Sequence, residues 1–163
     1  SLRNSPDQLF SLNPIDRIRC DHNGIVQLQP IEPLAFSKKQ KVIQIGPQWA
    51  KHEFSNILIR CRITSSKPEN ADGELFDADR VGDNIQLRHW RPGDRFQQIG
   101  NQSSSKLQDI MTNAKIGATD KRSRVLACND LGIPFWVQGL RIGELAKITS
   151  STKIFLSWKW SII

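Results

Sequence analysis

The sequence predicts an α+β fold that is mostly β, a β-sandwich or barrel-like sheet with one or two helices. Apolar and polar residues alternate in several short segments, which is the period of a half-buried strand. Gly, Pro, Asn and Ser separate these segments, as turns require. One segment, 103–117, has the period of an amphipathic helix instead. With 163 residues, 38% of them hydrophobic, the chain can bury the core of one ordinary domain.

The first residues are expected to form a tail followed by a hairpin. Residues 1–14 are mostly polar and contain two prolines, which is typical of a tail or linker. In residues 16–30, two strand-like segments flank Asn23 and Gly24, a pair that favours the type I′ turn of a hairpin. The sequence therefore predicts a hairpin as the first regular structure.

Two further strands and a polar loop follow. The segments 38–46 and 56–66 have the strand period, and the second places these apolar side chains on one face: Ile57, Ile59, Cys61 and Ile63. Residues 65–74 are polar and contain Pro and Gly, so they are the expected internal boundary. The sequence thus predicts a strand-rich connecting segment over 15–70 and a basic domain over 74–160.

The second half holds the predicted helix. A short turn or helical piece precedes a strand that begins at Ile85. In the helical segment, Ser105 and Gln108 have the spacing of a capping box, and Gly117 is the expected C-terminal stop. The helix is supported by an apolar stripe at positions i, i+3, i+4 and i+7: Leu107, Ile110, Met111 and Ala114.

Strands are expected again after the helix. Segments 124–128 and 133–139 predict two strands on either side of an Asn-Asp-Leu-Gly turn. Residues 145–160 predict a final hairpin. One side of its last strand carries Ile154, Leu156, Trp158 and Trp160.

Composition narrows the class of protein. No apolar run approaches 18 residues, so no membrane span is expected, and the first ten residues lack the pattern of a signal peptide. The chain begins without Met, and we expect it to be a fragment. An odd number of widely spaced cysteines suits reduced, apolar packing in a cytoplasmic protein better than a disulfide or metal framework: Cys20, Cys61 and Cys128.

The positive charge is confined to the second half. Residues 1–83 hold 11 Lys or Arg and 11 Asp or Glu. Residues 84–163 hold 12 basic and 5 acidic residues and so carry the whole net charge of +7. A basic half beside a neutral half indicates either a polyanionic partner such as nucleic acid, or a surface that only aids solubility.

The stretch "LRHWRPGDRFQQIG" concentrates this charge at a turn. Pro92 and Gly93 suit the two central positions of a type II turn, because Pro presets φ and Gly accepts a positive φ. Such a turn would project Arg91 and Arg95 close together, with Arg88 on the strand leading in. The planar guanidinium donates to two phosphate oxygens at once. The alternative is an ordinary turn whose arginines pair with the following Asp and water.

Further cations follow the turn. Lys106 stands at the expected helix start, where free N–H groups and the positive dipole end favour an anion, although a capped helix with a solvated lysine is equally simple. The run "DKRSR" is either a solvated face or an extension of the basic surface. The candidate phosphate contacts are Arg88, Arg91, Arg95, Lys106, Lys115, Arg122 and Arg124.

Catalytic, cofactor and metal sites are not expected in this chain. His22, His52 and His89 are far apart in sequence, and His89 is expected to pack or hydrogen-bond locally. No Ser–His–Asp order, paired carboxylate motif or nucleotide-binding glycine loop occurs. The spacing of the cysteines predicts no metal centre.

The order of motifs resembles a known family. "IQLRHWRPGDRFQQIG", "SSKLQDIMTNAKIG" and "FWVQGLRIGELAKIT" are similar in order and spacing to the C-terminal region of tRNA(Ile)-lysidine synthetases, over about residues 74–158. The resemblance implies the β-rich fold of that C-terminal domain. It implies that the whole enzyme uses ATP and lysine to convert the wobble cytidine of isoleucine tRNA to lysidine. It places that chemistry in a separate domain with an S-G-G-x-D-S loop, a motif absent from this sequence.

The sequence is compatible with two functions. The resemblance implies a tRNA-binding module, inactive alone, that grips the backbone and acceptor stem of isoleucine tRNA beside the rest of the synthetase. The alternative is a protein–protein interaction or dimerisation module, in which Trp158 and Trp160 form an apolar interface of a homodimer. No membrane partner is expected.

Overall fold

The computed structural model describes residues 9–11, 16–20, 26–30 and 36–163, which fall into two compact units. The first unit ends at Ala35 and contains a three-stranded antiparallel sheet in the order β1-β2-β3: β1 (Leu9–Ser11), β2 (Asp16–Cys20) and β3 (Val26–Pro30). β2 and β3 pair antiparallel, from Asp16 opposite Pro30 to Cys20 opposite Val26, which confirms the predicted pairing of the hairpin. The predicted Asn23-Gly24 turn lies outside the described residues. β1 lies within the segment predicted as a tail.

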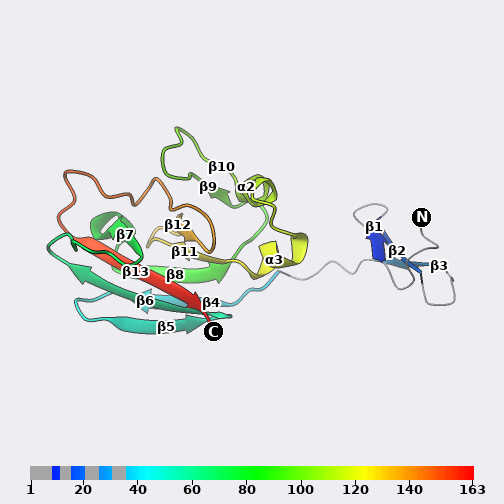
Figure 1. The fold of residues 1–163 in the computed structure, drawn as a ribbon, viewed down its shortest axis with the longest axis horizontal. Coiled ribbons are helices and arrows are strands. Elements are labelled where there is room, and N and C mark those ends of the chain that lie inside the picture. The colour runs from blue at the N-terminus through cyan, green and yellow to red at the C-terminus, as the bar shows by residue number, and fades with distance from the viewer. Residues whose placement is uncertain (1–8, 12–15, 21–25, 31–35) are drawn as a thin grey trace. The chain divides into compact units, whose positions relative to one another are not determined.

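The second unit, residues 36–163, contains two four-stranded antiparallel sheets (Figure 1). The first sheet has the order β12-β11-β8-β4: β12 (Pro134–Val137), β11 (Val125–Cys128), β8 (Asn84–His89) and β4 (Gln40–Gln44). The second has the order β5-β6-β13-β7: β5 (Ala50–Phe54), β6 (Ile57–Thr64), β13 (Phe155–Ile162) and β7 (Glu74–Asp77). The expected mostly β architecture is confirmed as a sandwich, without a closed barrel.

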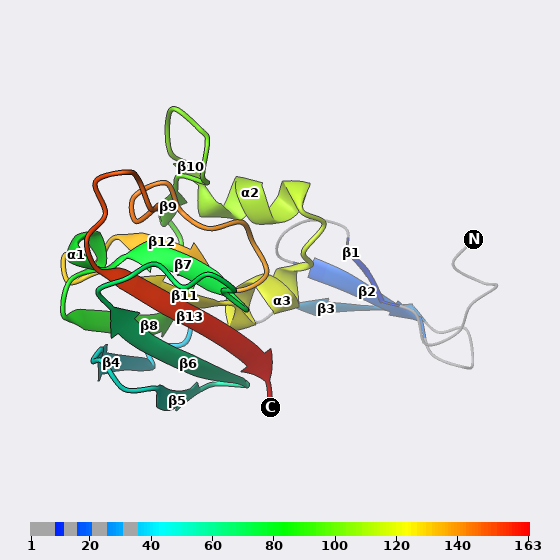
Figure 2. The same ribbon diagram turned by 60° about the vertical axis from the view of Figure 1, so that its left-hand side comes forward.

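Short helices and a ribbon connect these strands. α1 (Ala78–Val81) follows β7 directly, as the expected helical piece. A two-stranded ribbon of β9 (Arg95–Phe96) and β10 (Ser105–Lys106) leads into α2 (Leu107–Asn113), and α3 (Ala118–Ser123) follows. In both views the ribbon and α2 lie beside β11 and β12 and away from β5 (Figures 1 and 2).

The main core lies between the two sheets. Ile85 of β8 and Ile59 of β6 are both 0% exposed and belong to one apolar cluster. Trp158 of β13 meets the Trp136 ring edge-on, with ring centroids 5.5 Å apart, in a geometry that aromatic pairs prefer. Burial of the alternate residues of β6 confirms the face predicted from its period. These contacts join strands from both halves of the unit into one core.

A second core covers the outer face of the first sheet. Leu107 and Met111 of α2 pack with Phe96 of the ribbon in one apolar cluster. The cluster also contains Leu126 of β11 and Trp90, which directly follows β8. β11 is consequently buried at all four positions, and the last three residues of β8 are buried as well. α2 and the ribbon are therefore fixed to the sandwich by apolar packing.

The expected boundary at 65–74 is wrong. β6 before this loop and β7 after it both pair with β13. β4, from the same predicted connecting segment, pairs with β8 along its full length. The strands between 40 and 64 thus complete both sheets of the C-terminal unit, and the described unit begins at Phe36.

The predicted helix is shorter than its sequence pattern, and its capping box is not formed. Ser105 and Lys106 pair with β9, so the helix begins at Leu107. At the other end Lys115 takes the left-handed conformation, with φ of 61°. Gly117, the predicted stop, instead precedes α3 as its N-cap residue.

The predicted final hairpin is also wrong, whereas the hairpin before it is confirmed. β11 and β12 pair antiparallel, and the Asn129 side chain accepts hydrogen bonds from two backbone N–H groups in the turn between them. β13 pairs with β6 and β7 rather than with residues just before it. Ala146 instead lies in a loop, where its carbonyl accepts a hydrogen bond from the Asp77 N–H.

Candidate functional site

The arginine turn, defined as residues 88–95, links β8 to the ribbon. The Asp94 N–H donates to the Arg91 carbonyl at 3.1 Å, which closes a four-residue turn. Gly93 has φ of +90°, the positive value that the third residue of a type II turn requires. The predicted turn is therefore present, with Pro92 and Gly93 at its exposed tip.

A buried ion pair holds this turn in place. Arg88 is only 6% exposed and donates to both carboxylate oxygens of Asp94, at 2.8 and 2.9 Å. The same carboxylate accepts the Arg91 N–H at 2.8 Å, and Arg88 also donates to the His89 carbonyl. Burial alone lowers the pKa of Arg88, but the hydrogen bond and charge of Asp94 outweigh it and raise that pKa.

Arg88 is therefore part of the framework of the turn. Its guanidinium donates inside the protein, to Asp94 and His89, so the geometry does not favour the expected phosphate contact at this residue. Its strand is covered on the outer face by α2 and the ribbon, so no face of β8 is left for a large ligand at this position.

Two cations face each other across the ribbon. Arg95 of β9 and Lys106 of β10 are register partners, and both are exposed. The Arg95 guanidinium donates to the hydroxyl and carbonyl of Ser104, at 3.1 and 2.8 Å, so its position is fixed from the neighbouring loop. Like charges directly opposite each other disfavour an isolated ribbon, and an anion bound between them removes that cost.

The expected anion position at the start of α2 is altered by this ribbon. The Leu107 N–H donates to the Asp94 carbonyl at 2.8 Å, so one of the first N–H groups of the helix is already used. The exposed cationic groups here are therefore the Arg95 and Lys106 side chains, and they lie on the ribbon before the helix begins.

A groove of about 340 Å³ borders the ribbon and contains cations that the sequence did not single out. Arg80 of α1 and Lys147 of the loop before β13 line it together with Arg95. Lys147 pairs with Glu144, whose carboxylate also accepts the Gly100 N–H. The Lys147 and Gly100 hydrogen bonds lower the pKa of Glu144, which keeps this carboxylate ionised.

Sequence reasoning missed Arg80 and Lys147 because each is an isolated cation. Arg80 lies three residues after Asp77 on a four-residue helix, a pattern typical of a local ion pair. Lys147 lies in the "GLRIGELAKIT" stretch, so its motif was a signal, but the fold alone brings it to Arg95.

The remaining candidates lie around α2 and α3. Lys115 is exposed between the two helices. The Arg122 guanidinium lies 4.3 Å from the centroid of the Phe36 ring, which packs edge-on against Trp90. Arg124 is half-buried and packs closely on Gly139. The segment carries a further cation, Lys121, whose ammonium donates to the Thr112 hydroxyl.

These candidates therefore divide into a framework residue, Arg88, two groups of neighbouring cations, and Arg91. Arg95 and Lys106 lie together on the ribbon, beside Arg80 and Lys147. Lys115, Arg122 and Arg124 belong to the helical segment. Arg91 is half-buried at the start of the turn.

The two histidines that the structure describes lie on different sheets, His52 on β5 and His89 on β8. The His89 ring lies 3.2 Å from the Ser123 carbonyl and against Phe54, which confirms local packing. Burial and the charge of Lys41 lower the pKa of His52. Within residues 36–163, no three His, Cys, Asp or Glu side chains gather as metal ligands would. Of the helices that the structure describes, none has the length and apolar character to cross a membrane.

Of the two tryptophans of the expected interface, Trp158 is buried in the described unit. Trp158 is 1% exposed, and its ring packs on Phe135 and Trp136 inside the sandwich. Trp160 is half-buried against Trp136. A homodimer held by Trp158 would require the core to open, and dimerisation itself stays a prediction.

Comparison with known proteins finds relatives of one kind. The chain is 32% identical over 129 residues to a tRNA(Ile)-lysidine synthase of Clostridium acetobutylicum, which covers 76% of this chain and 28% of the relative. It is 35% identical over 143 residues to that of Clostridium perfringens, which covers 85% of this chain and 29% of the relative. The chain thus spans less than a third of the length of these relatives. No family model matches the chain.

A solved structure shares the fold. The crystal structure of a TILS C-terminal domain aligns with a TM-score of 0.61 and 19% sequence identity, over 77% of this chain and 98% of that domain. The sandwich described above is therefore a known architecture.

Proposed function

We propose that this chain is a tRNA-binding module of a tRNA(Ile)-lysidine synthase. The premise is that the chain is homologous to part of those synthases and has the fold of the TILS C-terminal domain. The observation that carries the proposal is the ribbon, where Arg95 and Lys106 are exposed opposite each other above a rigid turn. This pair would bind the sugar-phosphate backbone of isoleucine tRNA at its acceptor stem.

The physical basis of binding is charge at fixed positions. The Arg88–Asp94 pair holds the turn and Ser104 holds the Arg95 guanidinium, so Arg95 loses little side-chain freedom on binding. Arg80 and Lys147 line the neighbouring groove beside Arg95, where Glu144 pairs with Lys147. Phosphate contacts position a protein on a nucleic acid without reading its sequence. The module is therefore proposed to orient the tRNA, while base recognition and chemistry occur elsewhere in the synthase.

Catalysis is assigned to another part of the synthase. Activation of the wobble cytidine by ATP and attack by lysine need a nucleotide-binding loop, and the sequence contains no such glycine motif. The residues of this chain would contribute binding energy and orientation only.

The test is a filter-binding assay of the full chain with isoleucine tRNA. The variant Arg95→Ala/Lys106→Ala should lower the affinity by about tenfold or more, because it removes two phosphate contacts. Its melting temperature should stay close to that of the parent chain, because both side chains are exposed.

The matched control is Lys67→Ala, which removes an exposed cation from the loop between β6 and β7. It should leave tRNA binding within twofold of the parent chain. Equal binding by the ribbon variant and the control would contradict the assignment of tRNA to the ribbon. Binding of a non-cognate tRNA measured in parallel reports how much of the affinity depends on backbone contacts alone.

A further inference from the structure

A row of cations crosses the second sheet on its outer face. In β6, Ile59 and Cys61 are 0% exposed in the core, so the residue between them, Arg60, faces outward. The strand register puts Lys51 of β5 directly opposite Arg60 on one side and Lys159 of β13 on the other. We name Lys51, Arg60 and Lys159 the outer cation row.

The outer cation row is only partly neutralised. Lys159 pairs with Asp72 at 2.9 Å, and this carboxylate is 91% exposed. Glu53 lies on the same face of β5, two residues from Lys51 and opposite Leu58. No ion pair involving Lys51 or Arg60 occurs among residues 36–163. Like charges directly opposite each other across strands are unfavourable, so this arrangement favours a bound anion.

An exposed aromatic ring borders the row. Trp49 is 44% exposed immediately before β5. The Arg62 guanidinium lies 4.8 Å from the Trp49 ring centroid, and the Lys159 ammonium lies 5.3 Å from it. A row of cations beside an exposed aromatic ring is the combination that binds single-stranded nucleic acid, where phosphates meet the cations and a base stacks on the ring.

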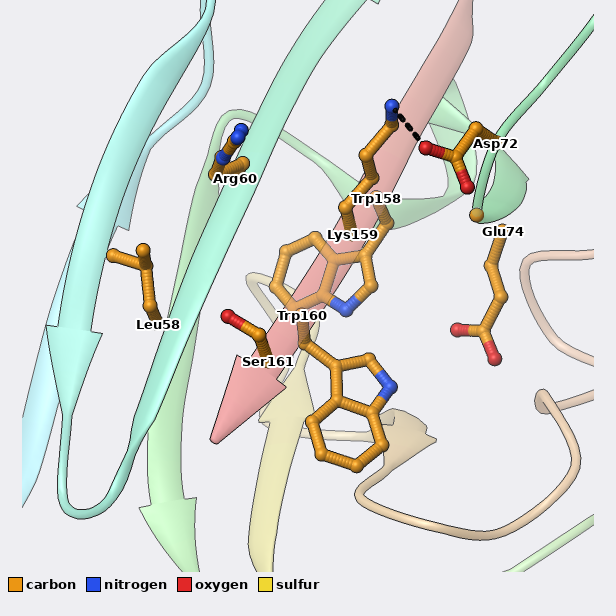
Figure 3. A pocket seen from close by; sticks show the side chains of 9 residues that line it. Leu58, Arg60, Asp72, Glu74, Trp158, Lys159, Trp160 and Ser161 are labelled. Carbon is orange, nitrogen blue, oxygen red and sulfur yellow. Dashed lines mark hydrogen bonds and ion pairs between the residues drawn. The ribbon is translucent and has the colours of Figure 1, made fainter. Parts of the chain in front are cut away.

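A hollow of about 360 Å³ at the β13 end of the row limits where a phosphate can bind. Arg60 and Lys159 line it, but so do Asp72 and Glu74 (Figure 3). In Figure 3 the Lys159 side chain extends to Asp72, away from Arg60. Asp72 pairs with Lys159 and Glu74 lies beside them, so within residues 36–163 the unpaired positive charge of the row is on Lys51 and Arg60.

We propose that the outer face of the second sheet is a second RNA-binding surface, which binds an unpaired RNA segment through phosphates at Lys51 and Arg60 and a base stacked on Trp49. This inference rests on the proposed function, because it takes RNA as the ligand. It goes beyond that function in assigning a separate surface and a single-stranded ligand. The ribbon packs on the outer face of the first sheet, so the two surfaces lie on opposite faces of the sandwich.

The experiment measures binding of the full chain to isoleucine tRNA and to a twelve-nucleotide oligouridylate. Lys51→Glu/Arg60→Glu should lower the affinity for both by at least tenfold and reduce the slope of log affinity against log salt by about 2. Trp49→Leu should lower oligouridylate affinity by about tenfold, and Trp49→Phe should restore most of it, because a smaller ring still stacks.

The matched control is Lys38→Glu/Lys153→Glu, which makes the same change of charge at two exposed lysines outside the row. Melting temperatures of all variants are compared to exclude unfolding. The second surface is overturned if the row variant binds both RNAs as the control does while Arg95→Ala/Lys106→Ala loses tRNA. If the parent chain binds neither RNA, the proposed function itself is contradicted, and the second surface with it. The proposal is also overturned if the parent chain binds phosphatidylserine vesicles and Lys51→Glu/Arg60→Glu loses that binding while it keeps RNA binding. The ligand of the row would then be a membrane surface.

Discussion

Arg88 and Arg95 lie seven positions apart in the stretch "LRHWRPGDRFQQIG" but have different surroundings. Arg88 is buried in a bidentate pair with Asp94, whereas Arg95 is exposed on the ribbon. The sequence predicted the turn but not this division. The reason is that the first sheet is covered on both faces, by the second sheet on one and by α2 and the ribbon on the other. These segments lie far from Arg88 in the chain or follow it.

Arg88→Ala should destabilise the fold strongly. Removal of one partner leaves the Asp94 carboxylate half-buried without its main counterion, and such losses typically cost about 3–5 kcal/mol. Urea unfolding followed by tryptophan fluorescence measures this free energy. Arg95→Ala, the matched change at an exposed position, should cost less than about 0.5 kcal/mol. Similar losses for the two variants would contradict the framework role of Arg88.

The buried thiols give a dependence of stability on pH. Burial raises the pKa of both Cys61 and Cys128 to about 11, from 9.0. The unfolded chain therefore loses these protons first, so stability is full below pH 9 and falls as pH rises towards 11. In a Cys20→Ser background, the folded chain should not react with a thiol reagent at pH 8, whereas the urea-unfolded chain should react twice. Fast reaction of the folded chain would show that these thiols are accessible.

At the level of elements, the turn was predicted because its chemistry is local. Pro92 and Gly93 encode the turn by their own dihedral preferences. The helix boundary was not predicted, because Ser105 pairs with Phe96 across the ribbon, and such pairing depends on residues nine positions away. Pairing to β9 replaced the capping box that the local pattern favours.

Gly93→Ala tests the conformation of the turn. Nothing lies within 4 Å of an added Cβ, so the cost comes from φ of +90° alone and should be about 1–2 kcal/mol. The control is Gly46→Ala, which also has open space but no positive φ, and it should change stability by less than about 0.5 kcal/mol. Thermal unfolding compares the two. Equal effects would mean that the turn does not require glycine.

Lys115→Gly should stabilise the end of α2. Lys115 has φ of 61°, a conformation in which glycine lacks the steric penalty of a side chain, so a gain of about 0.5–1 kcal/mol is expected. Lys115→Ala removes the same charge but keeps the Cβ, and it should give no such gain. A higher melting temperature for both variants would attribute the effect to charge instead.

At the scale of the whole molecule, the sequence predicted the fold class and most of the strands but not their assignment to sheets. β6 has a clear strand period, yet only its pairing with β13, about a hundred residues later, shows that it belongs to the C-terminal unit. The groove cations Arg80 and Lys147 were missed for the same reason, since the fold brings them to Arg95 from distant segments. Local sequence patterns predict the type of each element, whereas the residues that meet at the site depend on long-range strand pairing.

The central claim is that the ribbon binds the tRNA backbone through charge. The measurement is the affinity of the full chain for isoleucine tRNA from about 50 to 200 mM salt, for the parent chain and for Arg95→Ala/Lys106→Ala. The parent should show a steep linear fall of log affinity with log salt, and the variant a slope smaller by about 2, one for each lost phosphate contact. A parent affinity that does not change with salt, or a variant slope equal to that of the parent, would contradict the claim.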